Sequence, residues 1–327
     1  MKNTFGTKLR ITIFGASHAP TVGVTIEGVP SGIALSVADF EHDLSARRAG
    51  AHGTTPRRES DIPEITGTTD GVTTGAPLTI TFRNDNTRSS DYSAFEAHPR
   101  PSHVDLTARK KYGSDFDLRG SGIFSGRMTV ATVAAGVAAK KILPEGIRFS
   151  SETVEIGGCR DKSRFKQIIG EAAAAGDSVG GVVECRIDGL PSGIGEPLFD
   201  SVESVASHLL FSIPAVKGVE FGSGFEGVKL RGSERNDAIT DARGTTATNN
   251  EGGINGGITN GNTLIVRAAI KPTASIALPQ QTFNFDHNRI EPLTIGGRHD
   301  ACIAIRARIV VEAAMAIALA DLYLQQQ

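Results

Sequence analysis

The sequence contains no tryptophan, and tyrosine, methionine and cysteine occur only three times each. The cysteines Cys159, Cys185 and Cys302 are odd in number and have neither the paired spacing of a disulfide scaffold nor the spacing of a metal site. Such sparse cysteine is typical of proteins in a reducing compartment. We therefore expect a cytoplasmic protein that holds no metal.

Long apolar runs are also lacking. The run at residues 11–14 is too short for the hydrophobic region of a signal peptide. The most apolar stretch, residues 301–324, is interrupted by Arg306, Arg308, Glu312 and Asp321, which argues against a membrane span. The net charge is −2, so the chain as a whole does not favour a nucleic-acid or anionic-membrane partner.

Glycine, in contrast, is abundant: its 38 copies make up roughly 12% of the chain, against a usual ~7%. The glycines have no collagen-like period and sit in short clusters. Clusters of this kind favour tight turns and loops in which the backbone approaches a ligand closely. A turn-rich β protein is the alternative interpretation of the composition.

The pattern of apolar and polar residues predicts strands at 9–14, 22–29 and 263–270. Helices are predicted at 36–48, with Ser36 as N-cap and Asp39 three residues on, at 131–143 and at 307–324. Residues 49–61 have little periodicity and predict a loop. The two later helices are rich in alanine, which allows close packing against a sheet.

A similar eight-residue motif occurs once in each half of the chain. Residues 26–33 read IEGVPSGI and residues 187–194 read IDGLPSGI, and each half ends in an alanine-rich helix. The pattern indicates two similar halves, about 1–145 and 146–327, that fold around one shared core as a single domain. A coincidental strand-and-turn motif is the alternative.

The loop GASHAP at residues 15–20 places His18 directly after an apolar strand, where rigid scaffolds present functional groups. Histidine changes charge near neutral pH and can act as a general acid or base. An isolated histidine is more often structural. Ser17 alone does not indicate a serine hydrolase, because the sequence has no G-x-S-x-G elbow.

A second histidine-bearing loop, HPRPSHVD at residues 98–105, sets Arg100 three residues before His103. An arginine can bind an anionic group with two hydrogen bonds while the histidine donates or accepts a proton.

The segment RGSGIFSGRMT (119–129) has glycine spacing that resembles a dinucleotide fingerprint. However, the residues before it are polar, whereas a Rossmann fold requires a buried strand there. We interpret it as a glycine-rich loop that opens a helix and favours an anion, with Arg127 adding charge.

Three further segments fit the same chemistry. NNEGGINGGITNGN (249–262) is glycine-rich, and KPTAS (271–275) offers one cation and two hydroxyls, although an ordinary turn would explain it too. GGRHD (296–300) combines an arginine, a histidine and an aspartate before the last helix. Together these segments predict a site that binds anions and moves protons.

The motifs described above, taken together, resemble those of a known family, the chorismate synthases. GASHAPTVGVTIEGVPSG, SGIFSGRMTVATVAAGVAAKKIL and GGRHDACIAIRARIVVEA are similar to the three family signatures. DYSAF, HPRPSHVD, DSVGG, SIPAVKGVEFG, NNEGGINGGITNG and KPTASI follow the family's order and spacing. The resemblance covers essentially the whole chain.

The resemblance implies an α+β fold in which helices lie between two antiparallel sheets, with pseudo-twofold symmetry. It implies a homotetrameric lyase of aromatic amino-acid biosynthesis that requires reduced FMN. Such enzymes convert 5-enolpyruvylshikimate 3-phosphate to chorismate and phosphate by 1,4-anti elimination, and the flavin is thought to lend an electron transiently. NADPH enters only as a possible external or built-in reductant of the flavin.

The resemblance also implies roles for individual residues. His18 matches the histidine near the leaving phosphate, His103 the one on the N1 side of the flavin, and Asp300 the aspartate that assists removal of the C6 proton. Implied substrate-binding residues are Ser17, Arg47, Arg48, Arg100, Arg127 and Arg298, and Arg48 is also the implied NADP contact. Implied FMN contacts are Ser125, Pro214, Ala215, Gly256, Lys271, Pro272, Thr273, Ala274, Ser275 and Arg298.

The sequence departs from the family pattern in the stretch AGAHG after Arg48, which lacks an arginine that many members carry and for which Arg57 is a candidate substitute, and at three further positions. Ala16 replaces an acidic residue, Ala19 replaces a glycine, and Ile123 stands where arginine or histidine is common. These changes motivate a second hypothesis, a flavin- or phosphate-binding protein without catalysis. A third, an NAD(P)-dependent oxidoreductase, rests on glycine spacing alone.

Overall fold

The computed structural model describes residues 2–48, 50, 59–85, 95–113, 115–296 and 299–327. Its two larger sheets are antiparallel throughout. The first has five strands in the order β1-β2-β3-β7-β4: β1 (Thr4–Phe5), β2 (Arg10–Gly15), β3 (Thr21–Glu27), β7 (Leu78–Arg83) and β4 (Glu64–Thr66). The second has four strands in the order β10-β13-β9-β8: β10 (Val216–Phe221), β13 (Leu264–Ile270), β9 (Gly181–Asp188) and β8 (Arg148–Ile156).

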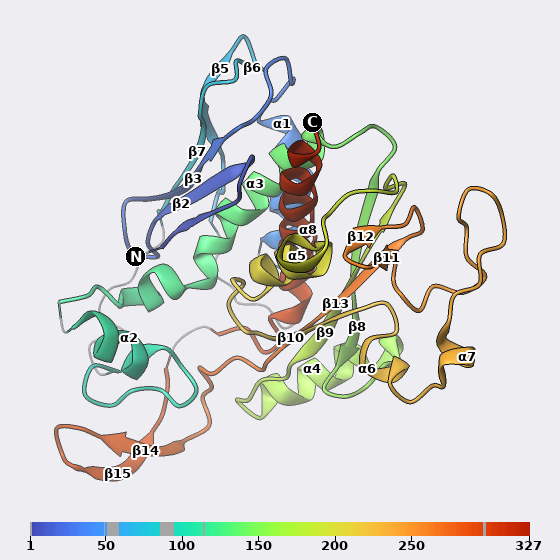
Figure 1. The fold of residues 1–327 in the computed structure, drawn as a ribbon. Coiled ribbons are helices and arrows are strands. Elements are labelled where there is room, and N and C mark those ends of the chain that lie inside the picture. The colour runs from blue at the N-terminus through green and yellow to red at the C-terminus, as the bar shows by residue number, and fades with distance from the viewer. Residues whose placement is uncertain (1, 49, 51–58, 86–94, 114, 297–298) are drawn as a thin grey trace.

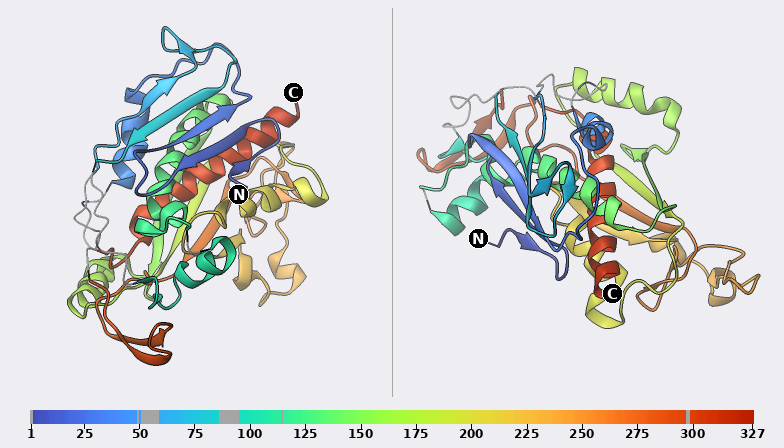
Figure 2. Two further views of the ribbon diagram at one scale, coloured as in Figure 1. Left: turned by 90° about the vertical axis from the view of Figure 1, so that its left-hand side faces the viewer. Right: turned by 90° about the horizontal axis from the view of Figure 1, so that it is seen from above.

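Two long helices lie between these sheets. Helix α3 (Thr129–Ile142) packs on strands of the first sheet, α8 (Ala304–Gln325) packs on strands of the second, and the helices pack against each other (Figures 1 and 2). Most residues of both helices are buried, because other elements cover both helices on most sides. This arrangement confirms the predicted layers and the predicted helices at 131–143 and 307–324.

The two central helices approach closely at Gly136. A Cβ atom at this position would lie 2.5 Å from Cβ of Ala313, so only glycine fits. The small side chains expected to allow close packing therefore pack helix against helix as well as helix against sheet. One continuous apolar core contains both helices and the inner faces of both sheets.

The echoed turns have matching geometry, which supports the internal repeat. Thr73 Oγ1 donates to the Pro30 carbonyl at 2.7 Å and accepts from the Ile33 N–H at 3.0 Å. In the second half, Thr259 Oγ1 donates to the Pro191 carbonyl at 2.7 Å and accepts from the Ile194 N–H at 2.9 Å. The two turns therefore share the same hydrogen bonds, while the pseudo-twofold relation of the two halves and a boundary near residue 145 stay predictions.

The remaining elements surround this frame. The short hairpins are β5 (Thr68–Thr69) with β6 (Val72–Thr73), β11 (Ile254–Asn255) with β12 (Ile258–Thr259), and β14 (Gln280–Asn284) with β15 (Arg289–Leu293), the last of which projects from the body (Figure 1). The other helices are α1 (Ala38–Arg47), α2 (Asp105–Tyr112), α4 (Phe165–Ala174), α5 (Val202–Leu210), α6 (Gly224–Gly227) and α7 (Gly232–Arg235). Short 3₁₀ turns span Arg119–Phe124, Gly126–Met128, Lys162–Arg164 and Leu198–Asp200.

Local expectations for the N-terminal half hold with one correction. Strands β2 and β3 and helix α1 lie where the sequence predicted them, but Ser36 does not cap α1 with its side chain. Its N–H and its hydroxyl both donate to Asp39 Oδ2, at 2.7 and 2.9 Å, so only the reciprocal half of the capping box forms. Most of the predicted loop 49–61 lies outside the described residues.

Candidate active site

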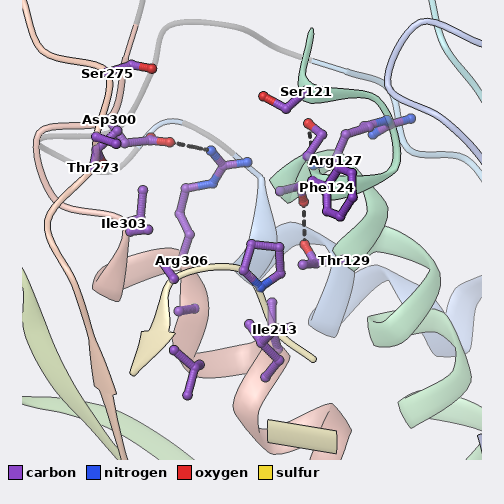
Figure 3. Close-up of a pocket in the computed structure, with 18 of the residues that line it drawn as sticks. Ser121, Phe124, Arg127, Thr129, Ile213, Thr273, Ser275, Asp300, Ile303 and Arg306 are labelled. Atoms are coloured by element: carbon purple, nitrogen blue, oxygen red, sulfur yellow. Dashed lines mark hydrogen bonds and ion pairs between the residues drawn. The ribbon is translucent and has the colours of Figure 1, made fainter. Parts of the chain in front are cut away.

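A cavity of about 750 Å³ lies at the N-terminal ends of both central helices. Thr129 at the start of α3 and Ile303 and Arg306 at the start of α8 contribute to its wall. The N-terminal end of a helix carries partial positive charge and exposed N–H groups, so both helices favour an anion here. In Figure 3, Thr273, Ser275 and Asp300 approach the cavity from one side and Ser121, Phe124 and Arg127 from the other.

The described wall of the cavity is strongly cationic. Seven basic side chains face it against three carboxylates. The basic residues are Arg47, Arg48, Arg100, Arg127, Lys217, Lys271 and Arg306, and the acidic ones are Glu59, Asp61 and Asp300. Such an excess of positive charge in a partly enclosed space attracts small molecules that carry several negative charges.

Two of these arginines share one buried carboxylate. Arg47 Nη2 lies 3.5 Å from Asp61 Oδ2, and Arg127 Nη1 donates to Asp61 Oδ1. Burial alone would raise the pKa of Asp61, but the charges of Arg47 and Arg127 outweigh burial and lower it. Burial lowers the pKa of Arg47 to about 10, although Asp61 opposes the change. Asp61 thus offsets part of the charge of the buried guanidinium groups and fixes their positions.

Arg127 also connects the cavity to the first histidine loop. Its Nε donates to Asn84 Oδ1 at 2.8 Å, and Asn84 Nδ2 donates to the carbonyl oxygens of Ala16 and Ala19 at 3.1 and 2.7 Å. The loop that carries Ser17 and His18 is therefore held by an amide that the sequence analysis did not single out.

His18 lies behind the glycine-rich loop rather than in the wall itself. Ser17 lines the cavity, and a Cβ atom added to Gly120 would lie 2.3 Å from His18 Cε1 and 2.6 Å from Ser17 Oγ. The Ser17 N–H donates to the Gly122 carbonyl at 3.1 Å. The missing side chain of Gly120 thus makes room for the imidazole of His18, and Gly120 separates the imidazole from the cavity.

His103 lines the cavity and has polar neighbours at both ring nitrogens. Nδ1 lies 2.7 Å from Asp105 Oδ1, and Nε2 lies 3.2 Å from Ser121 Oγ. Arg100 binds the same carboxylate, and its Nη1 donates to Ser275 Oγ at 3.1 Å. The two loops predicted from HPRPSHVD and KPTAS therefore meet at Arg100.

Asp300 is held by an arginine of α8. Arg306 Nη1 lies 3.2 and 3.3 Å from the two carboxylate oxygens of Asp300, and Arg306 Nε donates to the Arg47 carbonyl at 2.9 Å (Figure 3).

Lys271 is held by a backbone carbonyl of the second histidine loop: its Nζ donates to the Ser102 carbonyl at 2.6 Å. Burial and the charge of Lys217 lower the pKa of Lys271.

Several buried polar atoms in the wall make no hydrogen bond within the described part of the chain: Ser17 Oγ, Arg47 Nε, Arg48 Nε and Thr273 Oγ1. Buried polar atoms in native proteins usually have a partner, and each one left without costs about 1–3 kcal/mol. Two hydroxyl and two guanidinium donors with no partner among the described residues fit a ligand that accepts hydrogen bonds, such as a phosphate or a carboxylate.

The structure brings together most of the residues that the sequence predicted. The wall contains Ser17, Arg47, Arg48, Arg100, His103, Ser125, Arg127, Pro214, Ala215, Lys271, Pro272, Thr273, Ala274, Ser275 and Asp300. Gly256, in the turn between β11 and β12, is not among the described residues of the wall. Arg298 lies outside the described residues. Sequence reasoning missed Asp61, Asn84, Lys217 and Arg306, although Lys217 stands inside the quoted motif SIPAVKGVEFG and Arg306 inside the quoted run after GGRHD.

Among the described residues, no group of three or more histidine, cysteine, aspartate or glutamate side chains could hold a metal ion. No described helix has both the length and the apolar character that crossing a membrane requires.

Fold and cavity together define an α+β enzyme whose site suits a small polyanionic molecule. The family model of chorismate synthase matches residues 9–324. A chorismate synthase of Chitinophaga pinensis is 53% identical over 326 residues, which cover 99% of this chain and 97% of that protein. One of Dehalococcoides mccartyi is 44% identical, over 99% of this chain and 97% of its own.

A solved structure gives the same result. The crystal structure of a chorismate synthase matches with a TM-score of 0.75 and 28% identity, over 98% of this chain and 93% of that one. The chain belongs to the chorismate synthase family, a family of lyases. Family and fold place it at the chorismate-forming step of aromatic biosynthesis, and the resemblance, the enzyme class and the fold class predicted from the sequence are confirmed.

Proposed function

We propose that this enzyme converts 5-enolpyruvylshikimate 3-phosphate to chorismate and phosphate by 1,4-anti elimination, with reduced FMN bound in the same cavity. The observation that carries the proposal is the cationic cavity at the start of both central helices, which His103 and Asp300 line together with polar atoms that have no partner in the described chain. The substrate has one phosphate and two carboxylates, so it needs several cations and hydrogen-bond donors at once.

The arginines on the α1 side of the cavity suit the anionic groups of the substrate. Arg47 and Arg48 each have an Nε–H without a partner among the described residues, and Asp61 holds Arg47 and Arg127 in place. A guanidinium fork positioned by a carboxylate meets a second oxyanion with little loss of side-chain entropy. In this proposal Arg47 and Arg48 contact the substrate, while Arg298 enters by resemblance alone. Arg127 contributes its charge, because its Nε, Nη1 and Nη2 already donate to Asn84, Asp61 and the Arg83 carbonyl.

His18 is the proposed proton donor to the leaving phosphate. Departure of a phosphate becomes easier when an acid neutralises the charge that develops on its oxygen. The imidazole sits directly behind Gly120 and beside Ser17, whose hydroxyl is buried and has no partner in the described residues. Ser17 can therefore donate to the same phosphate or pass a proton from His18 to it.

Asp300 is the proposed acceptor that assists removal of the C6 proton. Arg306 holds its carboxylate at 3.2–3.3 Å from α8, and both residues face the cavity. The ion pair at this distance orients the carboxylate, whose oxygens are the atoms that would accept the proton.

Other lining residues fit FMN. Thr273 Oγ1 is buried without a partner in the described chain, Ser125 and the segment 214–215 also line the cavity, and Lys271 supplies a cation. When bound, reduced FMN would lend an electron to the substrate transiently. His103 would face the flavin with its ring Nε2. The proposed contact of Gly256 rests on the family resemblance alone.

Three further properties belong to the proposal by resemblance. NADPH would reduce the flavin from an external or built-in reductase, and Arg48 is the proposed NADP contact. The enzyme would assemble as a homotetramer and work in the cytoplasm. The substitutions Ala16, Ala19 and Ile123 lie around His18 and in the glycine-rich loop, so they bear on flavin contacts and on built-in reductase activity.

An anaerobic assay tests the proposal. With FMN kept reduced, substrate should yield chorismate, followed by its absorbance, and an equal amount of phosphate. Absence of chorismate while the flavin spectrum shows reduced FMN would refute the proposed reaction. Tight FMN binding without turnover would instead identify a binding protein, and nicotinamide turnover without FMN would identify an oxidoreductase.

A further inference from the structure

Asp105, the first residue of α2, connects the groups of the second histidine loop. It is buried, and both of its oxygens accept hydrogen bonds. Oδ2 accepts from the N–H and the Nε of Arg100 at 3.1 and 2.8 Å. Oδ1 accepts from Arg100 Nη2 at 2.8 Å and lies 2.7 Å from Nδ1 of His103. One carboxylate thus meets an arginine fork on one side and an imidazole on the other.

This geometry locates the proton of a neutral His103. Burial alone would raise the pKa of Asp105, but the hydrogen bonds from Arg100 and His103 outweigh burial and hold it well below its ordinary value. An ionised carboxylate can only accept, so the hydrogen between Oδ1 and Nδ1 must belong to Nδ1. The other nitrogen, Nε2, then carries a lone pair.

That lone pair is directed at the cavity. Its neighbour is Ser121 Oγ at 3.2 Å, and both residues line the wall. Ser121 has a φ of 70°, a left-handed conformation that is uncommon for a residue with a side chain. Backbone strain of this kind concentrates at functional sites, where it holds a side chain in a required place.

Arg100 is largely committed to the same arrangement. Its Nε and Nη2 donate to Asp105, its Nη1 donates to Ser275 Oγ, and its guanidinium lies 4.5 Å from the centre of the Phe95 ring. A guanidinium with these partners has little left for a substrate anion. Its position instead connects the loop of His103 to residues 271–275 of the other half of the chain.

We infer that Asp105 is a positioning residue that fixes His103 as the Nδ1–H tautomer and directs its Nε2 lone pair into the cavity. Through the same carboxylate it turns Arg100 from a substrate contact into a structural clamp between the two loops. The inference rests on the proposed function for its catalytic consequence, because His103 must exchange a proton at Nε2. The tautomer itself does not depend on the reaction.

The test uses Asp105→Asn, which keeps the shape and removes the charge. Two Arg100 donors meet Oδ2, so the amide oxygen of the introduced asparagine stays there and its NH2 group faces His103 Nδ1. The imidazole must then turn to the Nε2–H form to accept from that NH2 group. We expect kcat to fall about 100-fold, the lower range for a general acid–base group. The KM of the substrate should stay within about threefold, because the arginines near Asp61 are untouched.

Asp43→Asn is the matched control. Asp43 is a buried carboxylate that also lies beside a histidine nitrogen, His42 Nδ1 at 2.8 Å, and accepts from a cation, Lys140 Nζ at 2.7 Å. It is not in the described wall of the cavity. This variant should lower Tm and leave kcat within about twofold of the parent enzyme.

The direct readout is the ¹⁵N NMR spectrum of the imidazole side chains at a pH where they are neutral, with the His103 signals assigned by their loss in His103→Gln. The parent enzyme should show His103 as Nδ1–H and Asp105→Asn should show Nε2–H. An Nε2–H tautomer in the parent, an unchanged tautomer in the variant, or a kcat within about threefold would overturn the inference. If the parent makes no chorismate, the proposed function fails, and the spectrum still decides the tautomer.

Discussion

Gly120→Ala perturbs the separation between the cavity wall and His18. The new Cβ atom would lie 2.3 Å from His18 Cε1, 2.4 Å from Nδ1 and 2.6 Å from Ser17 Oγ, whereas ordinary contacts begin near 3.4 Å. The imidazole must therefore retreat by about 1 Å, a displacement that costs about 100-fold when it moves a reacting group. The φ of 58° adds roughly 1–2 kcal/mol of backbone strain to the folded state.

We expect kcat of Gly120→Ala to fall about 100-fold, or roughly 2.7 kcal/mol of lost transition-state stabilisation. The assay is chorismate formation under anaerobic conditions with reduced FMN, together with Tm from thermal unfolding. Gly71→Ala is the control, because Gly71 has a similar φ of 74° but its nearest neighbour would be the Leu35 carbonyl at 3.7 Å. It should lose stability and keep its activity. A kcat for Gly120→Ala within about threefold of the parent would refute the placement of His18 behind this glycine.

His18→Ala and His103→Ala should each lower turnover tenfold or more, because a positioned general acid or base contributes about 100-fold or more, and near-parental rates in both would remove their assigned roles. Asp321 accepts the N–H groups of residues 7, 8 and 9, so Asp321→Ala should lower the free energy of unfolding in urea by about 2–3 kcal/mol; a change under about 0.5 kcal/mol would contradict this. The pKa of Asp61 is lowered in the folded state, so its ionised form stabilises the fold above pH ~4, and this contribution is lost as the pH falls through the folded pKa. Asp61→Asn should therefore reduce the drop in Tm between about pH 5 and pH 2, and an unchanged drop would show that Asp61 does not contribute to acid unfolding.

The sequence predicted those parts of the molecule in which local pattern decides structure. The alanine-rich helices were expected at 131–143 and 307–324, and they span Thr129–Ile142 and Ala304–Gln325. Their many alanines indicate helices that pack closely on most sides, as both do in the structure. The echoed turns were recognised because a Pro-Ser-Gly turn constrains the backbone in the same way at both places.

The sequence could not predict contacts made across long separations. Asp61 stood in a segment without periodicity, and nothing near it in the sequence indicates that it lies between Arg47 and Arg127. Asn84, which follows a strand directly, joins Arg127 to the His18 loop. The family resemblance implied that Arg100 contacts the substrate. The structure shows that Arg100 already donates to Asp105 and Ser275.

Helix α8 has a consequence for synthesis on the ribosome. It lies at the centre of the molecule and is made after the strands of both sheets, and its Asp321 binds the backbone N–H groups of residues 7, 8 and 9. The apolar side of α3 that meets Ala313 therefore has no cover until α8 has left the ribosome. Nascent chains of this enzyme should depend on chaperones up to that point, and the first sheet should reach its final packing only afterwards.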